Sequence, residues 1–253
     1  MNQNTASTVP SGNKCIFLAG ASGAIGQRLA PLLVAAGWRL FGSTRRADKA
    51  PLLRAMGAEP VVVDVFDGAA LRTIMAEIRP EIVIHQLTDL PHALDASQME
   101  AALVRNARLR DEGTRNLVAA AVHAGAKRLI AQSISSIYAD GPEPHGEEDS
   151  LLAETHPVYG ETARAVASLE RQVLGASVDG IVLRYGLFYG PGTGFEAPIA
   201  PGSVHIDAAA KAAELAISQA TPGIYNVAEA DGSVTSAKAI RLLGWDAGWR
   251  AGR

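Results

Sequence analysis

The stretch Lys14–Arg28, KCIFLAGASGAIGQR, joins an apolar run to three spaced glycines and the start of an amphipathic helix. The apolar run predicts a strand over Lys14–Ala19. Gly20 permits a tight turn, Gly23 lets the backbone approach a pyrophosphate, and Gly26 lets helix and strand pack closely. Free N–H groups at the helix start, together with the helix dipole, favour an anion there. The stretch therefore predicts a strand–turn–helix unit that binds a dinucleotide.

Apolar strands and amphipathic helices alternate along the chain after this turn. The alternation predicts an α/β fold, a doubly wound parallel sheet of Rossmann type, whose ligands bind beyond the carboxyl ends of the strands. The continuous valines of Pro60–Val63 predict a strand buried on both faces. The other predicted strands are Arg39–Ser43, Ile82–His85, Arg128–Ala131 and Gly180–Arg184, and the predicted helices include Ala69–Ile78, Gln98–Ala124 and Glu161–Leu174.

Three regions are predicted. Residues 1–13 are polar, lack an apolar leader core and are expected to form a flexible tail. Residues 14–190 form the dinucleotide-binding domain. Residues 191–253 form a small, reduced C-terminal substrate lobe packed on that domain, with a helix at Asp207–Gln219, a strand at Gly223–Val227 and a helix at Ser236–Leu243.

Composition excludes several classes of function. The net charge of −3 gives no electrostatic basis for nucleic-acid binding. Cys15 is the single cysteine and is expected to be a buried, inert thiol, which excludes disulfides and thiolate metal sites. The six histidines lack metal-ligand spacing, and no apolar stretch reaches the length of a membrane span. We expect a cytoplasmic protein with no metal, membrane or nucleic-acid partner.

Two arginines follow the second predicted strand, where an acidic residue would bind a ribose 2′-hydroxyl. Arg45 and Arg46 suit a 2′-phosphate instead, so NADP is favoured and NAD is possible. Ordinary surface charge is the competing interpretation. Asp64 is a candidate acceptor for the adenine amino group, whereas Asp67 is expected to cap the next helix. The predicted cofactor-binding residues are Gly20, Ser22, Gly23, Ala24, Ile25, Gly26, Thr44, Arg45, Arg46, Asp64, Val65, Gln86 and Leu87.

Two other polar features are expected to be structural. His85 ends an apolar strand and is interpreted as a core histidine with satisfied hydrogen bonds rather than as a catalyst. Four arginines form a basic stripe on the predicted helix Gln98–Ala124. A solvated face balanced by Asp111 and Glu112 is the first interpretation, and a dimer contact is the second. The four are Arg105, Arg108, Arg110 and Arg115.

Eight motifs in a shared order resemble the extended short-chain dehydrogenase/reductases, specifically the NAD-dependent epimerase/dehydratase family. The resemblance implies a Rossmann sheet, an NAD or NADP cofactor and a homodimer through the long central helices. It also implies that Tyr185 and Leu187 lie near the nicotinamide. The motifs are GASGAIG (Gly20–Gly26), Asp64-Val65, VIHQL (Val83–Leu87), EGTRNLVAAA (Glu112–Ala121), KRLIAQSISSIYA (Lys127–Ala139), VLRYGLFYGPGTG (Val182–Gly194), SVHIDAAAKAAELAI (Ser203–Ile217) and GIYNVAE (Gly223–Glu229).

The resemblance also implies hydride chemistry with a tyrosine, and with a lysine one helical turn later that makes the tyrosine a base. Tyr159 matches the tyrosine, but Ala163 occupies the lysine place. If Glu170 is aligned to the acidic residue that family members carry on this helix, the pair falls on Thr162 and Val166 instead. Neither register supplies a lysine.

The family's third catalytic position, a Ser or Thr, falls on Ile134, with a serine on either side. Ser133 and Ser135 share one face of an extended strand, so either is a candidate. Tyr159, Ser133 and Ser135 are thus the predicted catalytic residues. The short segment Phe195–Gly202 leaves no room for the substrate lobe of sugar-nucleotide enzymes, so a small substrate is expected.

Two functions follow from these residues. The first is an NAD(P)-dependent oxidoreductase or epimerase/dehydratase that acts on a small substrate, with Tyr159 as acid/base. The alternative is a non-catalytic NADP-binding sensor or scaffold, which the missing lysine favours. The segment RYGLFYGPG, Arg184–Gly192, favours the enzyme, because the resemblance places it at the nicotinamide end of the cofactor and a protein that binds only the adenine end would need it less.

Overall fold

Seven parallel strands form one sheet in the order β3-β2-β1-β4-β5-β6-β9. The computed structural model describes residues 14–252, so the predicted tail lies outside the described residues. This sheet confirms the predicted doubly wound α/β fold. The strands are β1 (Cys15–Ala19), β2 (Arg39–Thr44), β3 (Glu59–Val62), β4 (Ile82–His85), β5 (Arg128–Ile134), β6 (Asp179–Tyr185) and β9 (Gly223–Val227).

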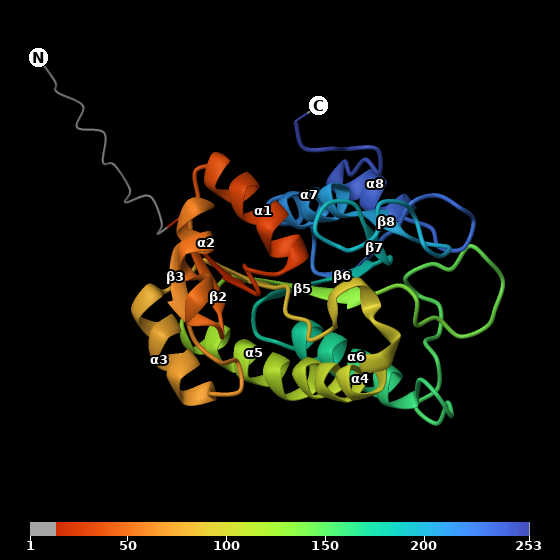
Figure 1. The fold of residues 1–253 in the computed structure, drawn as a ribbon, viewed down its shortest axis with the longest axis horizontal. Coiled ribbons are helices and arrows are strands. Elements are labelled where there is room, and N and C mark those ends of the chain that lie inside the picture. The colour runs from red at the N-terminus through yellow and green to blue at the C-terminus, as the bar shows by residue number, and fades with distance from the viewer. Residues whose placement is uncertain (1–13, 253) are drawn as a thin grey trace, which may run out of the picture.

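Helices cover both faces of the sheet (Figure 1). One face carries α1 (Ala24–Ala35), α2 (Ala50–Ala55), α7 (Ile206–Ala216) and α8 (Ala237–Leu243). The other carries α3 (Gly68–Ile78), α4 (Met99–Arg108), α5 (Thr114–His123) and α6 (Gly160–Leu174). Two short strands, β7 (Phe188–Tyr189) and β8 (Val204–His205), pair apart from the main sheet. Among the described residues, no helix has the length and apolar character needed to cross a membrane.

The central and edge strands differ in burial. β1 lies between two neighbours and is buried throughout, and burial raises the pKa of the Cys15 thiol to about 11. The prediction that Pro60–Val63 is buried on both faces is wrong. β3 pairs only with β2 at the edge of the sheet, and Val62 is 50% exposed. Consecutive valines therefore mark a strand here but not its place in the sheet.

The predicted long helix Gln98–Ala124 is interrupted. α4 ends at Arg108, a π-helical turn covers Leu109–Gly113, and α5 begins at Thr114. π-helical turns are rare in proteins, and those that occur often lie at functional sites. This turn faces α6 and the carboxyl end of β4, since Asn106 accepts a hydrogen bond from the Asp89 backbone and Thr114 bonds to His85.

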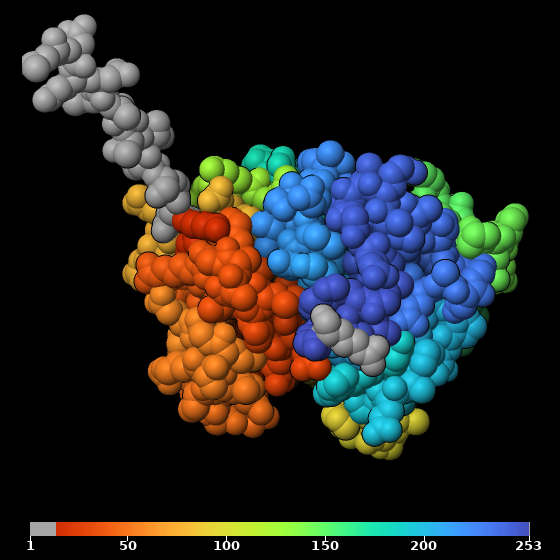
Figure 2. Space-filling model, turned by 90° about the horizontal axis from the view of Figure 1, so that it is seen from above, coloured from red at the N-terminus to blue at the C-terminus, as the bar shows by residue number. Residues whose placement is uncertain are grey.

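The C-terminal part of the chain is joined to the sheet rather than standing apart. β9 pairs with β6, and α7 packs along α1. Arg28 of α1 donates to Asp207 of α7 at 2.8 Å. Figure 2 shows the N-terminal and C-terminal halves side by side along this contact, with a notch between the orange and cyan segments at the lower edge.

Asp67 caps α3 as predicted, accepting a hydrogen bond from Ala70 N–H at 2.9 Å. Asp67→Ala leaves that N–H without its partner, so we expect the free energy of unfolding to fall by about 1 kcal/mol. Urea unfolding measures this difference. Glu77→Ala on the exposed side of the same helix is the control, with an expected change below about 0.5 kcal/mol. Equal losses in the two variants would contradict the capping role.

Candidate functional site

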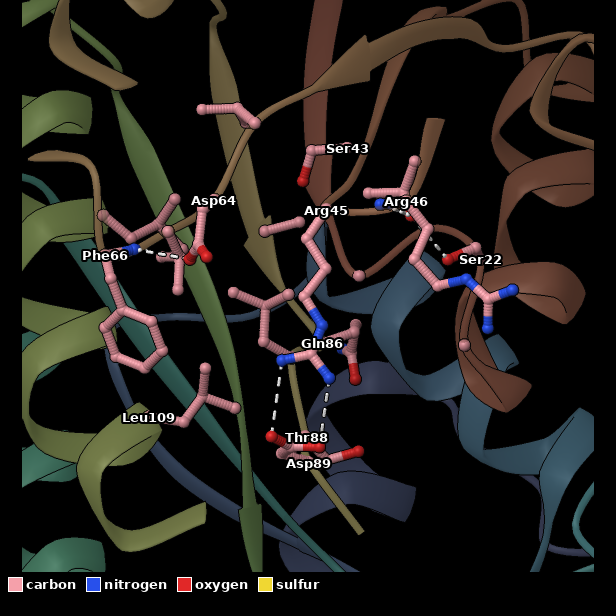
Figure 3. Close-up of a pocket in the computed structure, with 18 of the residues that line it drawn as sticks. Ser22, Ser43, Arg45, Arg46, Asp64, Phe66, Gln86, Thr88, Asp89 and Leu109 are labelled. Atoms are coloured by element: carbon pink, nitrogen blue, oxygen red, sulfur yellow. Dashed lines mark hydrogen bonds and ion pairs between the residues drawn. The ribbon is translucent and has the colours of Figure 1, made fainter. Parts of the chain in front are cut away.

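A cleft of about 380 Å³ lies at the carboxyl ends of β1, β2, β3 and β4 (Figure 3). This is the edge at which a doubly wound sheet binds ligands. It brings together ten predicted cofactor residues: Gly20, Ser22, Gly23, Thr44, Arg45, Arg46, Asp64, Val65, Gln86 and Leu87. Ala24, Ile25 and Gly26 form the first turn of α1 beside the cleft, and Tyr185 and Leu187 lie at and after the end of β6.

Backbone atoms lie so close to two glycines of the Gly20–Gly26 turn that neither position has room for a side chain. Gly20 has a φ of 85°, and a Cβ there would lie 2.7 Å from the Gln86 carbonyl oxygen. A Cβ on Gly26 would lie 2.4 Å from the Gly20 carbonyl oxygen. A Cβ on Gly23, which lines the cleft, would meet only that same oxygen, at 3.3 Å. Gly20 and Gly26 are thus required by the fold, whereas Gly23 keeps the cleft open.

Gly23→Ala separates ligand binding from folding. The methyl group would intrude on the cleft at the helix start, so we expect the affinity for any dinucleotide to fall about 30-fold, the size of a typical overpacking penalty. Fluorescence titration with NADPH measures the affinity, and circular dichroism checks the fold. Gly146→Ala is the control, because its added methyl would be 4.0 Å from the nearest side chain, that of Thr235. An unchanged affinity in Gly23→Ala would contradict pyrophosphate binding at this turn.

One end of the cleft is basic. Arg45 extends across it to Asp89, with nitrogen–oxygen distances of 3.2 and 3.3 Å (Figure 3). Arg46 pairs with Asp48 at 2.6 Å and donates its backbone N–H to Thr44. Lys49 also lines the cleft, and among the described residues no side chain hydrogen-bonds to its ammonium group. Sequence analysis missed Lys49 and Asp89, although Lys49 lies only three residues after Arg46.

Asp64 lines the cleft at the end of β3, where it was predicted to meet the adenine. One of its oxygens accepts the Phe66 N–H at 2.9 Å, which leaves the other free of protein partners among the described residues. Phe66 itself lines the cleft, with the Arg108 guanidinium 4.1 Å from its ring centroid. An aromatic wall and a carboxylate oxygen are suited to a purine base.

Buried polar atoms without partners mark the other end. Gln86 is 3% exposed, and neither atom of its amide has a hydrogen-bond partner within the described residues. The Tyr185 hydroxyl lies beside Gln86 and is fully enclosed, and burial raises the pKa of Tyr185 although the neighbouring Gln86 amide opposes the shift. Buried polar groups are rarely left unpaired. The Gln86 amide and the Tyr185 hydroxyl are thus enclosed together by the protein at this end of the cleft, which Gln86 lines.

The predicted catalytic residues do not lie together. Tyr159 precedes α6, is 48% exposed and stacks on His156 at 5.5 Å between ring centroids. Ser135 follows β5 and lines a second cavity of about 310 Å³ with Tyr138 and His145. Ser133 is buried and donates to Glu170 at 2.7 Å. Their catalytic roles stay predictions.

Glu170 is the centre of a buried network. It also accepts two hydrogen bonds from Arg184, at 2.9 and 2.7 Å, and these raise the pKa of Arg184. Arg184 in turn donates to the Tyr138 hydroxyl, which donates to Asn226. The network ties α6 to β6 and β9 and holds Ser133 in place.

Both positions considered for the family lysine are apolar. Ala163 and Val166 are buried with Ile137 and pack against Ile134 and Leu151. Arg164, the cation that follows Ala163, is exposed and pairs with Glu154. In either alignment, therefore, the position of the family lysine is occupied by an apolar residue with apolar neighbours.

His85 is a core histidine, as predicted. Its Nδ1 accepts the Leu87 N–H at 3.2 Å, so its Nε2–H donates to the Thr114 hydroxyl at 3.0 Å. Burial and the nearby Arg110 lower the pKa of His85 to about 4, which keeps the ring neutral at pH 7. Both ring nitrogens are occupied, so His85 is not available as a general base.

Comparison with known proteins identifies the family. The model of the NAD dependent epimerase/dehydratase family matches residues 16–214. The chain belongs to this family. A curated relative from a Streptomyces species, 3-diazoavenalumate denitrifying reductase, is 37% identical over 235 residues, which cover 85% of this chain and 75% of the relative. Two further curated relatives match over about half of their own length. The predicted family and its class of NAD(P)-dependent enzymes are thereby confirmed.

Solved structures of other proteins share the fold. UDP-glucose 4-epimerase of Thermotoga maritima superposes with a TM-score of 0.74 at 20% identity, over 92% of this chain and 93% of the epimerase. The yeast methylglyoxal/isovaleraldehyde reductase complexed with NADPH superposes with a TM-score of 0.73 at 17% identity, over the same shares. Identities this low establish the architecture of the epimerase/dehydratase family and nothing finer.

Proposed function

We propose that the chain is an NADPH-dependent reductase of a small substrate. The observation that carries the proposal is the basic end of the cleft, which Arg45, Arg46 and Lys49 all line after β2. A 2′-phosphate matches this charge, whereas a free 2′-hydroxyl would call for an acceptor. The reductase relative at 37% identity supports the same direction of reaction.

The residues present fit the cofactor. The Gly20–Gly26 turn would hold the pyrophosphate at the start of α1. Asp64 and Phe66 would take the adenine, and Gln86 and Leu87, which line the cleft after β4, would lie beside the rest of the cofactor. The cofactor supplies a hydride when bound, and the chain positions it at the carboxyl ends of β4 and β6.

The missing lysine favours reduction over oxidation. Oxidation of an alcohol needs a base, and a tyrosine becomes a base at neutral pH when a neighbouring cation stabilises its phenolate. α6 carries apolar residues at both positions considered for that cation. Reduction needs only that an uncharged hydroxyl donates its proton.

The experiment that tests the function uses NADPH carrying deuterium at nicotinamide C4. The protein is incubated with this cofactor and a panel of small aldehydes, ketones and aryl diazonium salts, starting with methylglyoxal. Mass spectrometry should find deuterium on carbon in one product class, at a rate that exceeds the rate with labelled NADH. Tight NADPH binding without deuterium transfer to any acceptor would contradict the reductase assignment.

A further inference from the structure

Arg110 departs from the other arginines of its helix. Arg108 pairs with Glu112 at 2.7 Å and Arg115 with Asp111 at 2.6 Å, as the predicted solvated stripe requires. Arg110 lies within the π-helical turn and is 7% exposed, so its place in that stripe was wrongly predicted. Among the described residues, nothing forms a hydrogen bond or ion pair with its guanidinium group. A guanidinium has five N–H donors, and in Arg110 all five lack an acceptor among residues 14–252.

The groups around Arg110 cannot neutralise it. His85 is uncharged, and both of its ring nitrogens are occupied. Glu170 is the acidic group that acts on the charge of Arg110, but its oxygens already accept from Ser133 and Arg184. Two buried arginines thus share one buried carboxylate. One positive charge is left over next to the end of β4.

This arrangement is costly for the protein alone. Burial lowers the pKa of Arg110 to about 10, because the charged form loses its hydration. A buried charge without a partner is among the most destabilising features a fold contains. The guanidinium nitrogens are not among the fully enclosed unpartnered atoms, so they keep a small accessible surface. An anion from outside the chain can therefore reach them.

The cofactor leaves this charge unused. Its pyrophosphate is assigned to the start of α1 and its 2′-phosphate to the loop after β2, on the β1–β2 side of the cleft. Arg110 lies on the opposite side, between the carboxyl end of β4 and α6, and only its neighbour Leu109 lines the cleft. Its turn packs on α6, the helix that carries apolar residues at both positions considered for the lysine. The missing anion must then come with the substrate.

We propose that Arg110 binds the substrate through a carboxylate or similar oxyanion, so that the reductase is selective for small acidic substrates. The inference rests on the proposed function. A planar guanidinium binds a carboxylate through two parallel N–H···O bonds, which fixes orientation as well as charge. An arginine from the π-helical turn would hold the substrate close to the nicotinamide end of the cleft, where Gln86 and Tyr185 lie.

The test measures binding, so that it does not depend on turnover. Acetate and benzoate are the probes, with acetamide and benzamide as uncharged counterparts, titrated into protein saturated with NADP⁺. We expect at least one carboxylate to raise the melting temperature of the protein while its amide does not. Arg110→Met should bind that carboxylate on the order of 30-fold more weakly, as expected when one charged pair is lost. Arg110→Lys should fall between the two.

A second readout excludes a merely structural role. Removing an uncompensated buried charge should raise the melting temperature of Arg110→Met without ligand, whereas removing a structural arginine would lower it. Arg115→Met, which removes an exposed paired arginine from the same helix, is the matched control and should change neither quantity. NADPH affinity should be unchanged in Arg110→Met.

Three results would overturn the proposal. In the first, neither acetate nor benzoate raises the melting temperature of the parent protein more than its uncharged amide does. In the second, Arg110→Met melts at a lower temperature and binds the carboxylate as well as the parent protein does. In the third, Arg110→Met loses NADPH affinity, which would assign the guanidinium to the cofactor. Failure of the parent protein to bind NADPH at all would instead contradict the proposed function, so the two failures are distinguishable.

Discussion

The double variant Arg45→Ala, Arg46→Ala should bind NADPH about 1000-fold more weakly than the parent protein, with NADH affinity changed by less than about threefold. Each arginine offers a charge-assisted hydrogen bond to a 2′-phosphate, and such bonds contribute roughly 1.5–3 kcal/mol each. NADH has no phosphate there and loses nothing. Fluorescence titration of both cofactors against both proteins measures the four dissociation constants.

Asp89 gives a reciprocal control for the same site. Its carboxylate holds Arg45 across the cleft and also pairs with Arg105 at 3.3 Å, so it competes with a phosphate for Arg45. Asp89→Asn should therefore raise NADPH affinity and leave NADH unaffected. Equal affinities of the parent protein for NADPH and NADH would remove the phosphate argument, whatever the variants do.

Tyr159→Phe should lower turnover with a carbonyl substrate on the order of 100-fold, the usual contribution of a positioned general acid. The Kd for NADPH should stay the same, because the exposed Tyr159 side chain does not line the cofactor cleft. The phenyl ring keeps its stacking on His156, so only the hydroxyl is removed. Steady-state kinetics separate the two effects.

Val158→Ala is the control for this variant, since Val158 is exposed and precedes Tyr159. It should leave turnover unchanged. Full turnover in Tyr159→Phe would contradict the acid role. That result would fit an acceptor that carries its own positive charge, since hydride transfer to such an acceptor produces no alkoxide and needs no proton.

The residues predicted to bind the cofactor could be expected to lie together because each follows a strand or a turn that the sequence itself predicts. Gly20, Gly23 and Gly26 sit within one turn, and parallel strands deliver Arg45, Asp64 and Gln86 to the same edge. The cleft gathers these residues as expected. Lys49 and Asp89 were not predicted as residues of the cleft. Their place there depends on how two segments far apart in the sequence approach each other across it.

The features that sequence analysis missed depend on long-range packing. An apolar run gives the same signal in a central and an edge strand, so β3 was taken for a buried strand. Arg110 lies in the sequence among arginines that face solvent. The spacing of an ordinary α-helix therefore predicts that Arg110 is exposed with them. The π-helical turn changes the direction in which the Arg110 side chain points. Nothing in the sequence LRDEG predicts that turn.

The packing of α7 on α1 has a consequence for the synthesis of the chain. Leu29 and Leu33 of α1 share a core cluster with Ala209 and Ala213 of α7, which come about 180 residues later. During translation, the first Rossmann unit can form its strands early, but one side of its glycine-turn helix stays open to water until α7 emerges from the ribosome. Ribosome-bound chains that stop before residue 206 should therefore present this apolar surface to chaperones.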